Sequence, residues 1–400
     1  MTFKRPEIFF RAVLPIRSED FYEELGACLN SLLLMAKETD ARVFKLVVFH
    51  DPVDEDEDQL HYQYTREAIG RYFPSGCPTW VMTGHAPELG YKVSIEAGFL
   101  KSGSCKIAYR QTGVLNYVML EWPGYRELWA SGLRDRNVRE SFEQEAESSF
   151  KILKSLLESE NMNFNNIVRQ WNYIGGIVHD NQVSGAETIN YQIFNEIRHQ
   201  YYKKYRTVKG FPAATGIGNR FNHVDIDICA IQATQEELKD FAIENPNQVN
   251  PYQYGQQVLL GVPILSQKIK HPPEFERAKL VVTGDLIRLF ISGTASIIGQ
   301  ETIGIGDVEK QTYCTIENIE KLTDFHHVRA SYPELPQGSF QYNFLRIYIK
   351  GRMDLQQVKS ICLRKFPNVP MVFVIVDICR DELLLEIEGE MQFVPEADPN

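Results

Sequence analysis

The 400-residue sequence lacks the features that mark several large classes of protein. No uninterrupted apolar run is long enough for a membrane-spanning helix, and the beginning MTFKRPEIFF has no apolar signal stretch, so we expect a cytoplasmic protein. Seven scattered cysteines, an odd number, indicate free thiols rather than a disulfide framework. Lysine and arginine (42) are outnumbered by aspartate and glutamate (53), and the net charge of −11 argues against a nucleic-acid surface.

Metal and nucleotide motifs are also missing. There is no CxxC or HExxH, and GIGNR (216–220) and GIGDV (304–308) are too short for a dinucleotide fingerprint. We therefore expect no metal and no nucleotide cofactor. The acidic stretch DPVDEDED (51–58) lacks the glycine and final glutamate of an EF-hand loop, and it predicts a solvated, flexible linker.

What the sequence does contain is an ordered alternation of strand and helix patterns, clearest in its last third. LVVT and LIRLFIS flank Gly284-Asp285, which is a strong hairpin signal. Apolar residues at helical spacing follow, alternating with further strand patterns. The expected order is β-β-α-β-α-β with a final extension. The strands lie at 280–283, 286–292, 344–350 and 370–378, the helices at 307–322 and 354–366, and the extension is a further strand at 384–390.

A similar order can be drawn upstream. Candidate strands lie at 105–110, 114–122, 167–177 and 223–231, and candidate helices lie at 138–160 and 186–205. Two copies of one plan predict an α+β fold of two tandem domains, each a sheet with helices on one face. We expect an N-terminal extension (1–95) packed on the first domain (96–245), a connecting segment (246–276) and a second domain (277–400).

Several stretches together resemble a known family. The segments LFISGTASIIGQETIGIGDVEKQTYCTIENI (289–319), LRIYIK (345–350) and DICRDELLLEIEGE (377–390) are similar to the C-terminal half of the chorismatases. That half is itself similar to the RidA (YjgF) fold, so the resemblance implies two tandem RidA/YjgF-like domains, the first degenerate. Upstream, RQWNYIGGI (169–177) and FPAATGIGN (211–219) are similar to further chorismatase stretches.

The resemblance implies an enzyme that releases pyruvate from chorismate without a cofactor. The other product is a dihydroxycyclohexadiene carboxylate or a hydroxybenzoate. The enol ether of chorismate must be protonated on its methylene carbon, which requires a carboxylic acid that is still protonated near neutral pH. The family's proton donor lies at the LLxEIE position, which is Glu386 here. Strand alternation puts Glu388 on the same face, and we expect it nearer the sheet edge, in solvent or paired. Alternatively, Glu386 pairs with Arg380 or closes a domain interface.

Cys379 is the second candidate for the catalytic site. Family members that form hydroxybenzoate are similar in having cysteine here and a glycine matching Gly293, so the resemblance implies that product. Cys379 stands seven residues before Glu386, which would point it to the opposite face of a regular strand unless a bulge or turn intervenes. The alternative is a small buried core residue.

Chorismate is a dianion, so its pocket should present cationic groups. Arg346 is the expected carboxylate anchor, and Tyr348 points the same way; the alternative is a surface arginine on an edge strand. Further hydrogen-bonding candidates are Tyr191, Thr215 and the backbone around Gly216, although ATGIG also fits a turn that demands glycine.

Three departures from the family pattern weaken the substrate assignment. Gln192 and Asn247 stand where the family commonly has arginine, and the segment 254–270 is longer than the corresponding loop. The alternative function is therefore a catalytically inactive RidA-like protein that binds a carboxylated metabolite or a partner. In either case we expect a small-molecule ligand, no nucleic acid, no membrane, and a monomer or small homo-oligomer.

Overall fold

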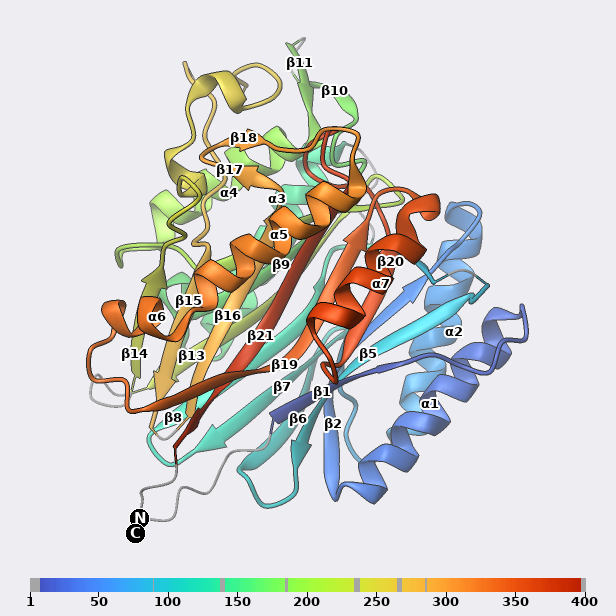
Figure 1. Cartoon of the computed structure of the whole chain (residues 1–400). Helices are drawn as coiled ribbons and strands as arrows, with labels where there is room; N and C mark the ends of the chain where they lie inside the picture. Colours follow the sequence, from blue (N-terminus) through green and yellow to red (C-terminus); the bar gives the residue numbers. More distant parts are fainter. Residues whose placement is uncertain are drawn as a thin grey trace.

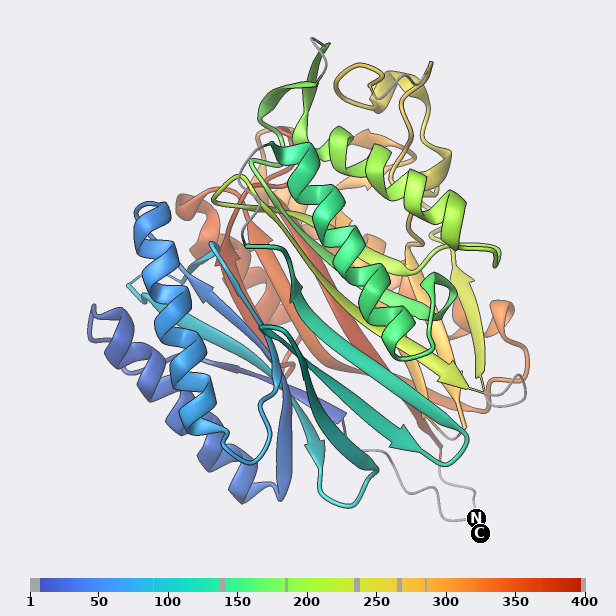
Figure 2. The same ribbon diagram turned by 180° about the vertical axis from the view of Figure 1, so that it is seen from behind.

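The computed structural model describes residues 8–88, 90–136, 141–183, 186–233, 238–264, 268–284 and 286–396. Within these residues, three large sheets face one another, and each is covered on its outer side by helices (Figures 1 and 2). The predicted α+β fold is therefore confirmed. No helix in the described ranges is both long and apolar enough to cross a membrane.

The first sheet is built from residues 8–101, most of which precede the predicted domains. Its order is β1-β5-β2-β3, and helices α1 (Phe21–Glu38) and α2 (Glu55–Tyr72) cover it. The acidic stretch 51–58 is not a linker, because the Asp54 side chain accepts a hydrogen bond from the Glu57 N–H and begins α2. Four acids in the first turn also suit the positive end of a helix dipole. The strands are β1 (Ile8–Val13), β2 (Ala41–His50), β3 (Thr79–Thr83) and β5 (Val93–Lys101).

The second sheet has the order β12-β9-β13-β8-β7-β6 and is covered by α3 (Phe142–Ser159) and α4 (Asn190–Tyr205), which are green in Figure 2. Its strands are β6 (Lys106–Thr112), β7 (Leu115–Trp122), β8 (Tyr125–Leu133), β9 (Ile167–Gly175), β12 (Ala213–Asn219) and β13 (Val224–Ala233). A small ribbon, β10 (Asp180–Val183) with β11 (Ala186–Ile189), projects beside α4.

The third sheet has the order β14-β15-β16-β21-β19-β20-β4, and its helices are α5 (Val308–Thr323), α6 (Phe325–Ser331) and α7 (Leu355–Lys365). Gly284 has a positive φ of 55° in the predicted β15–β16 turn, while Asp285 lies outside the described residues. The strands are β4 (Ala86–Pro87), β14 (Leu238–Ile243), β15 (Ala278–Thr283), β16 (Leu286–Ala295), β19 (Gly338–Ile349), β20 (Met371–Ile375) and β21 (Leu385–Pro395); β17 (Ile297–Ile298) and β18 (Glu301–Thr302) pair separately.

One pairing plan occurs in all three sheets. β16 pairs antiparallel with β21, β21 antiparallel with β19, and β19 parallel with β20. The same sequence of pairings joins β8, β13, β9 and β12, and again β1, β5, β2 and β3. Each parallel pair is bridged by a crossover helix, as parallel strands require. We call these units the first (8–101), second (106–233) and third (238–396) repeats; the first occupies residues that the sequence analysis assigned to an extension.

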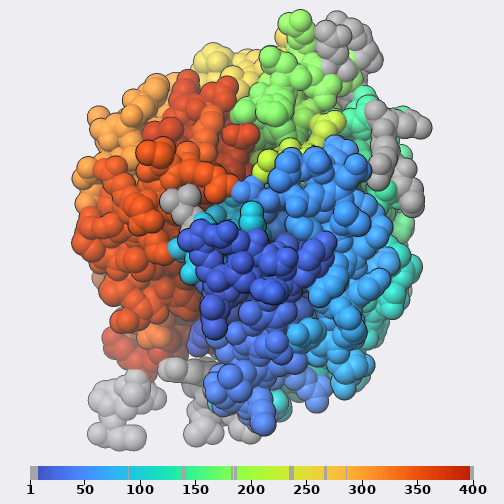
Figure 3. All heavy atoms as spheres, turned by 90° about the vertical axis from the view of Figure 1, so that its right-hand side faces the viewer, coloured from blue at the N-terminus to red at the C-terminus, as the bar shows by residue number. Residues whose placement is uncertain are grey.

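The sheets are buried on both faces. Their outer faces form separate cores with their own helices, whereas their inner faces meet in one core that includes Phe44, Trp129 and Tyr348 from the three repeats. Strands buried on both sides read as continuous apolar runs, as FKLVVFH does. Figure 3 shows the first repeat, in blue, packed directly against the orange and red third repeat.

Buried ion pairs connect the repeats in a cycle. Lys45 of the first repeat pairs with Asp227 of the second at 3.2 Å, and Arg169 of the second pairs with Glu388 of the third at 2.5 Å. Arg346 of the third repeat pairs with Glu96 of the first at 2.8 Å. Removing one partner of such a pair leaves an uncompensated buried charge, so these contacts fix how the repeats sit together.

Candidate active site

A cavity lies at the junction of the second and third repeats. Its walls come from β12 and α4 on one side and from β16, β21 and the loop before β21 on the other. The empty volume is about 700 Å³, including the mouth that opens to solvent. Five of the predicted catalytic and substrate-binding residues line it, namely Glu386, Cys379, Gly293, Tyr191 and Gly216.

Glu386 is a buried carboxyl group on the inner face of β21. Its neighbours Leu385 and Ile387 point the other way, into the core beneath the helices. Only 4% of Glu386 is exposed. Burial, reinforced by the nearby negative charge of Glu388, raises the pKa of Glu386 to about 8, although Arg277 and Arg169 act in the opposite direction. The carboxyl group therefore keeps its proton at neutral pH, as a general acid requires.

Gly293 provides the space that this carboxyl group occupies. A Cβ atom at position 293 would lie 1.9 Å from Glu386 Oε1 and 2.8 Å from its Cδ. Both distances are far below van der Waals contact, so any larger residue would displace the acid.

Glu388, two residues further along β21, is completely buried rather than close to solvent. It pairs with Arg169, lies 3.0 Å from Arg346 Nη1, and accepts hydrogen bonds from Trp171 Nε1, Thr215 and the Tyr348 hydroxyl. Burial alone would raise the pKa of Glu388, but Arg346 and Arg169 with these hydrogen bonds hold it below its usual value. Two acids on one strand face are thus driven into opposite protonation states.

The structure does not bring Arg346, Tyr348 or Thr215 to the cavity wall. Arg346 is fully buried at the junction of all three repeats, and Nε and Nη2 both donate to the Glu96 carboxylate. β19 is a central strand, so the edge-strand alternative does not apply either. Thr215 Oγ1 accepts from Gly293 N at 3.1 Å and from Arg169 Nη2 at 2.7 Å. These residues hold Glu388 instead of a ligand.

Two other arginines, which the sequence reasoning did not assign to binding, line the cavity. Arg277 is 3% exposed, and its Nη2 donates to the Val249 carbonyl and to the Tyr254 hydroxyl, both at 2.7 Å. The Nε of Arg277 has no hydrogen-bond partner among the described residues. Arg380 donates to the Gln300 carbonyl at 2.9 Å, and its guanidinium lies 5.3 Å from the centre of the Tyr254 ring. Arg277 carries no local sequence signal, whereas Arg380 stands within the DICR motif.

The departures from the family pattern have different locations. Gln192 lines the cavity, and its amide donates to Glu196 Oε1 at 2.6 Å and to the His271 carbonyl at 3.1 Å. Asn247 is not part of the wall; its backbone bonds with Asn245 and Gly299. The longer segment supplies aromatic and apolar wall from Tyr254, Val258, Leu259 and Leu260, and its residues 265–267 lie outside the described ranges.

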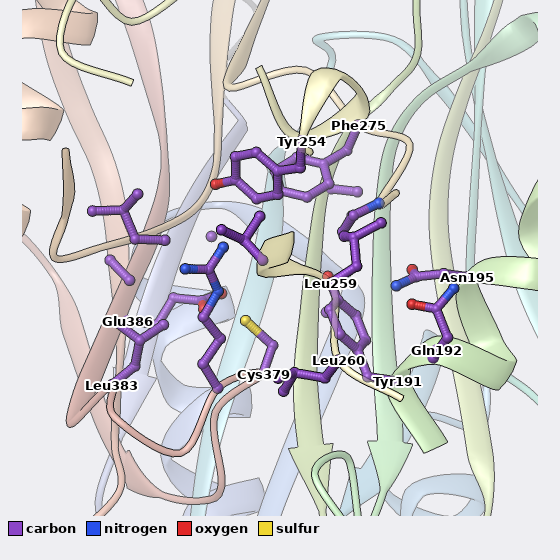
Figure 4. Close-up of a pocket in the computed structure, with 18 of the residues that line it drawn as sticks. Tyr191, Gln192, Asn195, Tyr254, Leu259, Leu260, Phe275, Cys379, Leu383 and Glu386 are labelled. Atoms are coloured by element: carbon purple, nitrogen blue, oxygen red, sulfur yellow. The ribbon is translucent and has the colours of Figure 1, made fainter. Parts of the chain in front are cut away.

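Figure 4 shows how the labelled side chains surround the cavity. Glu386 and Leu383 face Tyr191, Gln192 and Asn195 across it, with Tyr254 and Phe275 above.

The sulfur of Cys379 points toward the centre of Figure 4. Cys379 lies in the loop between β20 and β21, which removes the face restriction of a regular strand. Burial raises the pKa of its thiol to about 12, so the thiol is neutral. Burial likewise raises the pKa of Tyr191 well above its ordinary value.

Comparisons with known proteins agree with this architecture. Residues 100–230 match the family model described as "Chorismatase FkbO/Hyg5-like, N-terminal". A crystal structure of a chorismatase superposes with a TM-score of 0.66 at 21% identity, covering 96% of this chain and 98% of that one. The chain therefore has the chorismatase fold, and the resemblance that the motifs indicated is confirmed.

Two curated relatives come from Streptomyces hygroscopicus. A 3-hydroxybenzoate synthase is 33% identical over 232 residues, which make up 58% of this chain and 64% of the relative. A chorismatase is 29% identical over 225 residues, which make up 56% of this chain and 60% of the relative. The match thus spans less than two thirds of each relative's length.

Proposed function

We propose that the protein is a chorismatase-type enzyme that converts chorismate to pyruvate and a hydroxybenzoate. The observation that carries this proposal is a carboxyl group, Glu386, that holds its proton at neutral pH in a cavity whose wall also contains Arg277 and Arg380. A neutral acid beside two guanidinium groups suits a dianionic substrate that must be protonated on carbon.

In the proposed reaction, Glu386 gives its proton to the methylene carbon of the enol ether. The positive charge that develops at the ether carbon is shared by the ether oxygen and weakens the bond between that oxygen and the ring carbon. Cleavage of this bond releases pyruvate, whose keto oxygen is the former ether oxygen. The ring keeps its hydroxyl oxygen and loses one ring proton to become aromatic, which replaces the proton that Glu386 gave. Arg277 and Arg380 hold the two carboxylates, so that the side chain of the substrate faces the acid. Hydroxybenzoate and pyruvate together contain the atoms of chorismate, so the conversion consumes no redox partner.

The remaining wall residues have supporting roles in this proposal. Tyr191 and the Gly216 strand form the wall opposite Glu386 and contribute hydrogen bonds to the ring of the substrate. Gly293 and Cys379 leave room beside the acid, in line with the hydroxybenzoate type. The match to a 3-hydroxybenzoate synthase makes the 3-isomer the product that we expect.

Arg169, Arg346, Tyr348 and Thr215 act through Glu388 as positioning residues. They keep Glu388 ionised, and its negative charge helps to keep Glu386 protonated. Arg346 and Tyr348 on β19, which the sequence analysis assigned to substrate binding, therefore act on the site without lining the cavity.

The test is incubation of the purified protein with chorismate, with pyruvate measured by a coupled lactate dehydrogenase assay and the aromatic product identified by mass and retention time. Glu386→Gln should nearly stop pyruvate release, whereas Glu382→Gln, an exposed acid of the same loop, should not. Wild-type protein that releases no pyruvate above the spontaneous rate would overturn the proposal.

A further inference from the structure

A second cavity lies between the first and second repeats, at the position that corresponds to the Glu386 cavity. It is lined by the beginning of α2, by Arg134 and Arg136 after β8, by Glu145 on α3, and by the loop before β13 that carries His223. Its empty volume is about 710 Å³, including its opening. We call it the Asp225 cavity, after the carboxylate that contacts two of its wall residues.

The strand register shows that the two cavities correspond. The ladder between β8 and β13 shifts opposite Ser131 and Gly132, and the ladder between β16 and β21 shifts opposite Ser292 and Gly293. Asp227 and Glu388 occupy the matching positions on the partner strands, and both belong to the buried ion pairs between repeats. Asp225 therefore corresponds to Glu386, Arg134 to Ala295, and Arg136 to Ile297.

Polar atoms at the Asp225 cavity are buried without hydrogen-bond partners among the described residues. Glu145, a wall residue that is 4% exposed, has an unpartnered Oε2 that lies 3.5 Å from the equally unpartnered Nε of Arg134. Asp225 is fully buried behind this wall and pairs with His223 Nε2 at 3.2 Å and Arg136 Nη2 at 3.9 Å. Buried polar atoms are nearly always paired, so Glu145 Oε2 and Arg134 Nε suit a ligand that donates and accepts.

The chemistry of this cavity differs from that of the Glu386 cavity. Burial would raise the pKa of Asp225, but His223, Arg134 and Arg136 lower it to about 2, so Asp225 is ionised and cannot serve as an acid. A dianion would meet the carboxylate of Asp58 and the Glu145 carboxyl group, whose pKa burial raises to about 7 against the effect of Arg134, as well as the arginines. Groups of opposite sign on one wall instead suit a ligand that itself carries both signs.

We propose that the Asp225 cavity binds a free α-amino acid, whose carboxylate contacts Arg134 and Arg136 and whose ammonium group contacts Glu145 and Asp58. The ammonium group supplies the donor that Glu145 Oε2 lacks, and the ligand carboxylate accepts from Arg134 Nε. Asp58, which pairs with His50 at 3.0 Å, and Glu55 complete the acidic side of the wall. This binding is independent of the proposed reaction.

The experiment is isothermal titration of the full-length protein with each proteinogenic amino acid in turn. For any amino acid that binds, the matching amine without the carboxylate and the matching acid without the ammonium group are titrated too. Each truncated analogue should bind about tenfold or more weakly, because it loses charge-assisted hydrogen bonds. Arg134→Gln and the nearly isosteric Glu145→Gln should weaken binding similarly, while the exposed Lys151→Gln on the same helix should not.

The Glu386→Gln variant distinguishes binding in the Asp225 cavity from binding in the Glu386 cavity. It should leave the affinity for the amino acid unchanged. Binding that is lost in Glu386→Gln, or that persists undiminished in both Arg134→Gln and Glu145→Gln, would put the ligand elsewhere and overturn the proposal. A set of titrations in which no amino acid binds wild-type protein would overturn it as well.

Discussion

Replacing Glu386 with glutamine tests the central physical argument, because the two side chains have nearly the same shape and only one can donate an acidic proton. A positioned general acid contributes about 10²–10⁴-fold to a rate. We therefore expect Glu386→Gln to lower the rate of chorismate cleavage by at least about 10²-fold. The neutral amide fits the space beside Gly293, so the fold should be retained.

The same substitution should change how stability depends on pH. The folded-state pKa of Glu386 is about 8 and its ordinary value is 4.5, so between these values the folded protein holds a proton that the unfolded chain releases. The contribution of this carboxyl group to stability is complete below pH 4.5 and is lost as the pH rises through 8. At pH 7 the loss is about 3 kcal/mol, from roughly 2.5 pH units at about 1.4 kcal/mol each.

Glutamine does not titrate, so the variant should escape this loss. Its free energy of unfolding relative to wild type should rise steadily between about pH 4.5 and 8, by up to about 3 kcal/mol at pH 7. Urea unfolding of both proteins across this range measures the difference, with Glu382→Gln as the matched control. A difference that stays flat with pH would refute the statement that Glu386 is a neutral buried acid, whatever happens to activity.

Three further substitutions probe the surroundings of the acid. Gly293→Ala should displace the Glu386 carboxyl group, abolishing pyruvate release and destabilising the protein by about 1–3 kcal/mol in urea unfolding. Arg277→Gln should raise the KM for chorismate about tenfold or more, because a charge-assisted contact is lost, while the exposed Arg364→Gln leaves KM unchanged. Glu388→Gln should destabilise the fold by about 3–5 kcal/mol, since Arg169 and Arg346 lose their charged partner. It should also lower the pKa of Glu386, so that the fall of the rate at high pH moves to lower pH.

Motifs identified the part of the site that lies within one repeat. The residues around Glu386, Cys379 and Gly293 come from recognisable segments of the third repeat, and local spacing was sufficient to associate them. Arg346 was assigned to the substrate because it alternates with apolar neighbours in LRIYIK and a dianion needs a cationic anchor. Alternation gives the face of a strand, but it cannot show that this face meets Glu96 of another repeat instead of a cavity. Arg277 was missed because nothing in its neighbourhood marks it.

The first repeat was overlooked for a related reason. Its acidic stretch has the composition of a solvated linker, and only the hydrogen bond to Asp54 reveals the beginning of a helix. Its sheet also has no strand corresponding to β15 or β7, so the hairpin signal that marked the third repeat is absent from the described part of the first. The composition of this segment therefore predicted an extension, whereas its strand pairings show a third copy of the repeat.

The three junctions between repeats suggest why one of them favours acid chemistry. At the second–third junction the residues beyond Gly293 are Ala295 and Ile297, and Glu388 carries a negative charge close to Glu386. Both the apolar wall and this charge keep Glu386 protonated. At the first–second junction Arg134 and Arg136 take those two places and hold Asp225 ionised. At the third–first junction the matching position on β5, two residues before Glu96, is Ser94, which has no acidic proton to give. The same strand arrangement thus places a neutral acid (Glu386), a carboxylate anion (Asp225) and a hydroxyl group (Ser94) at corresponding positions. The side chains on the adjoining segment determine whether the acidic group is neutral or ionised.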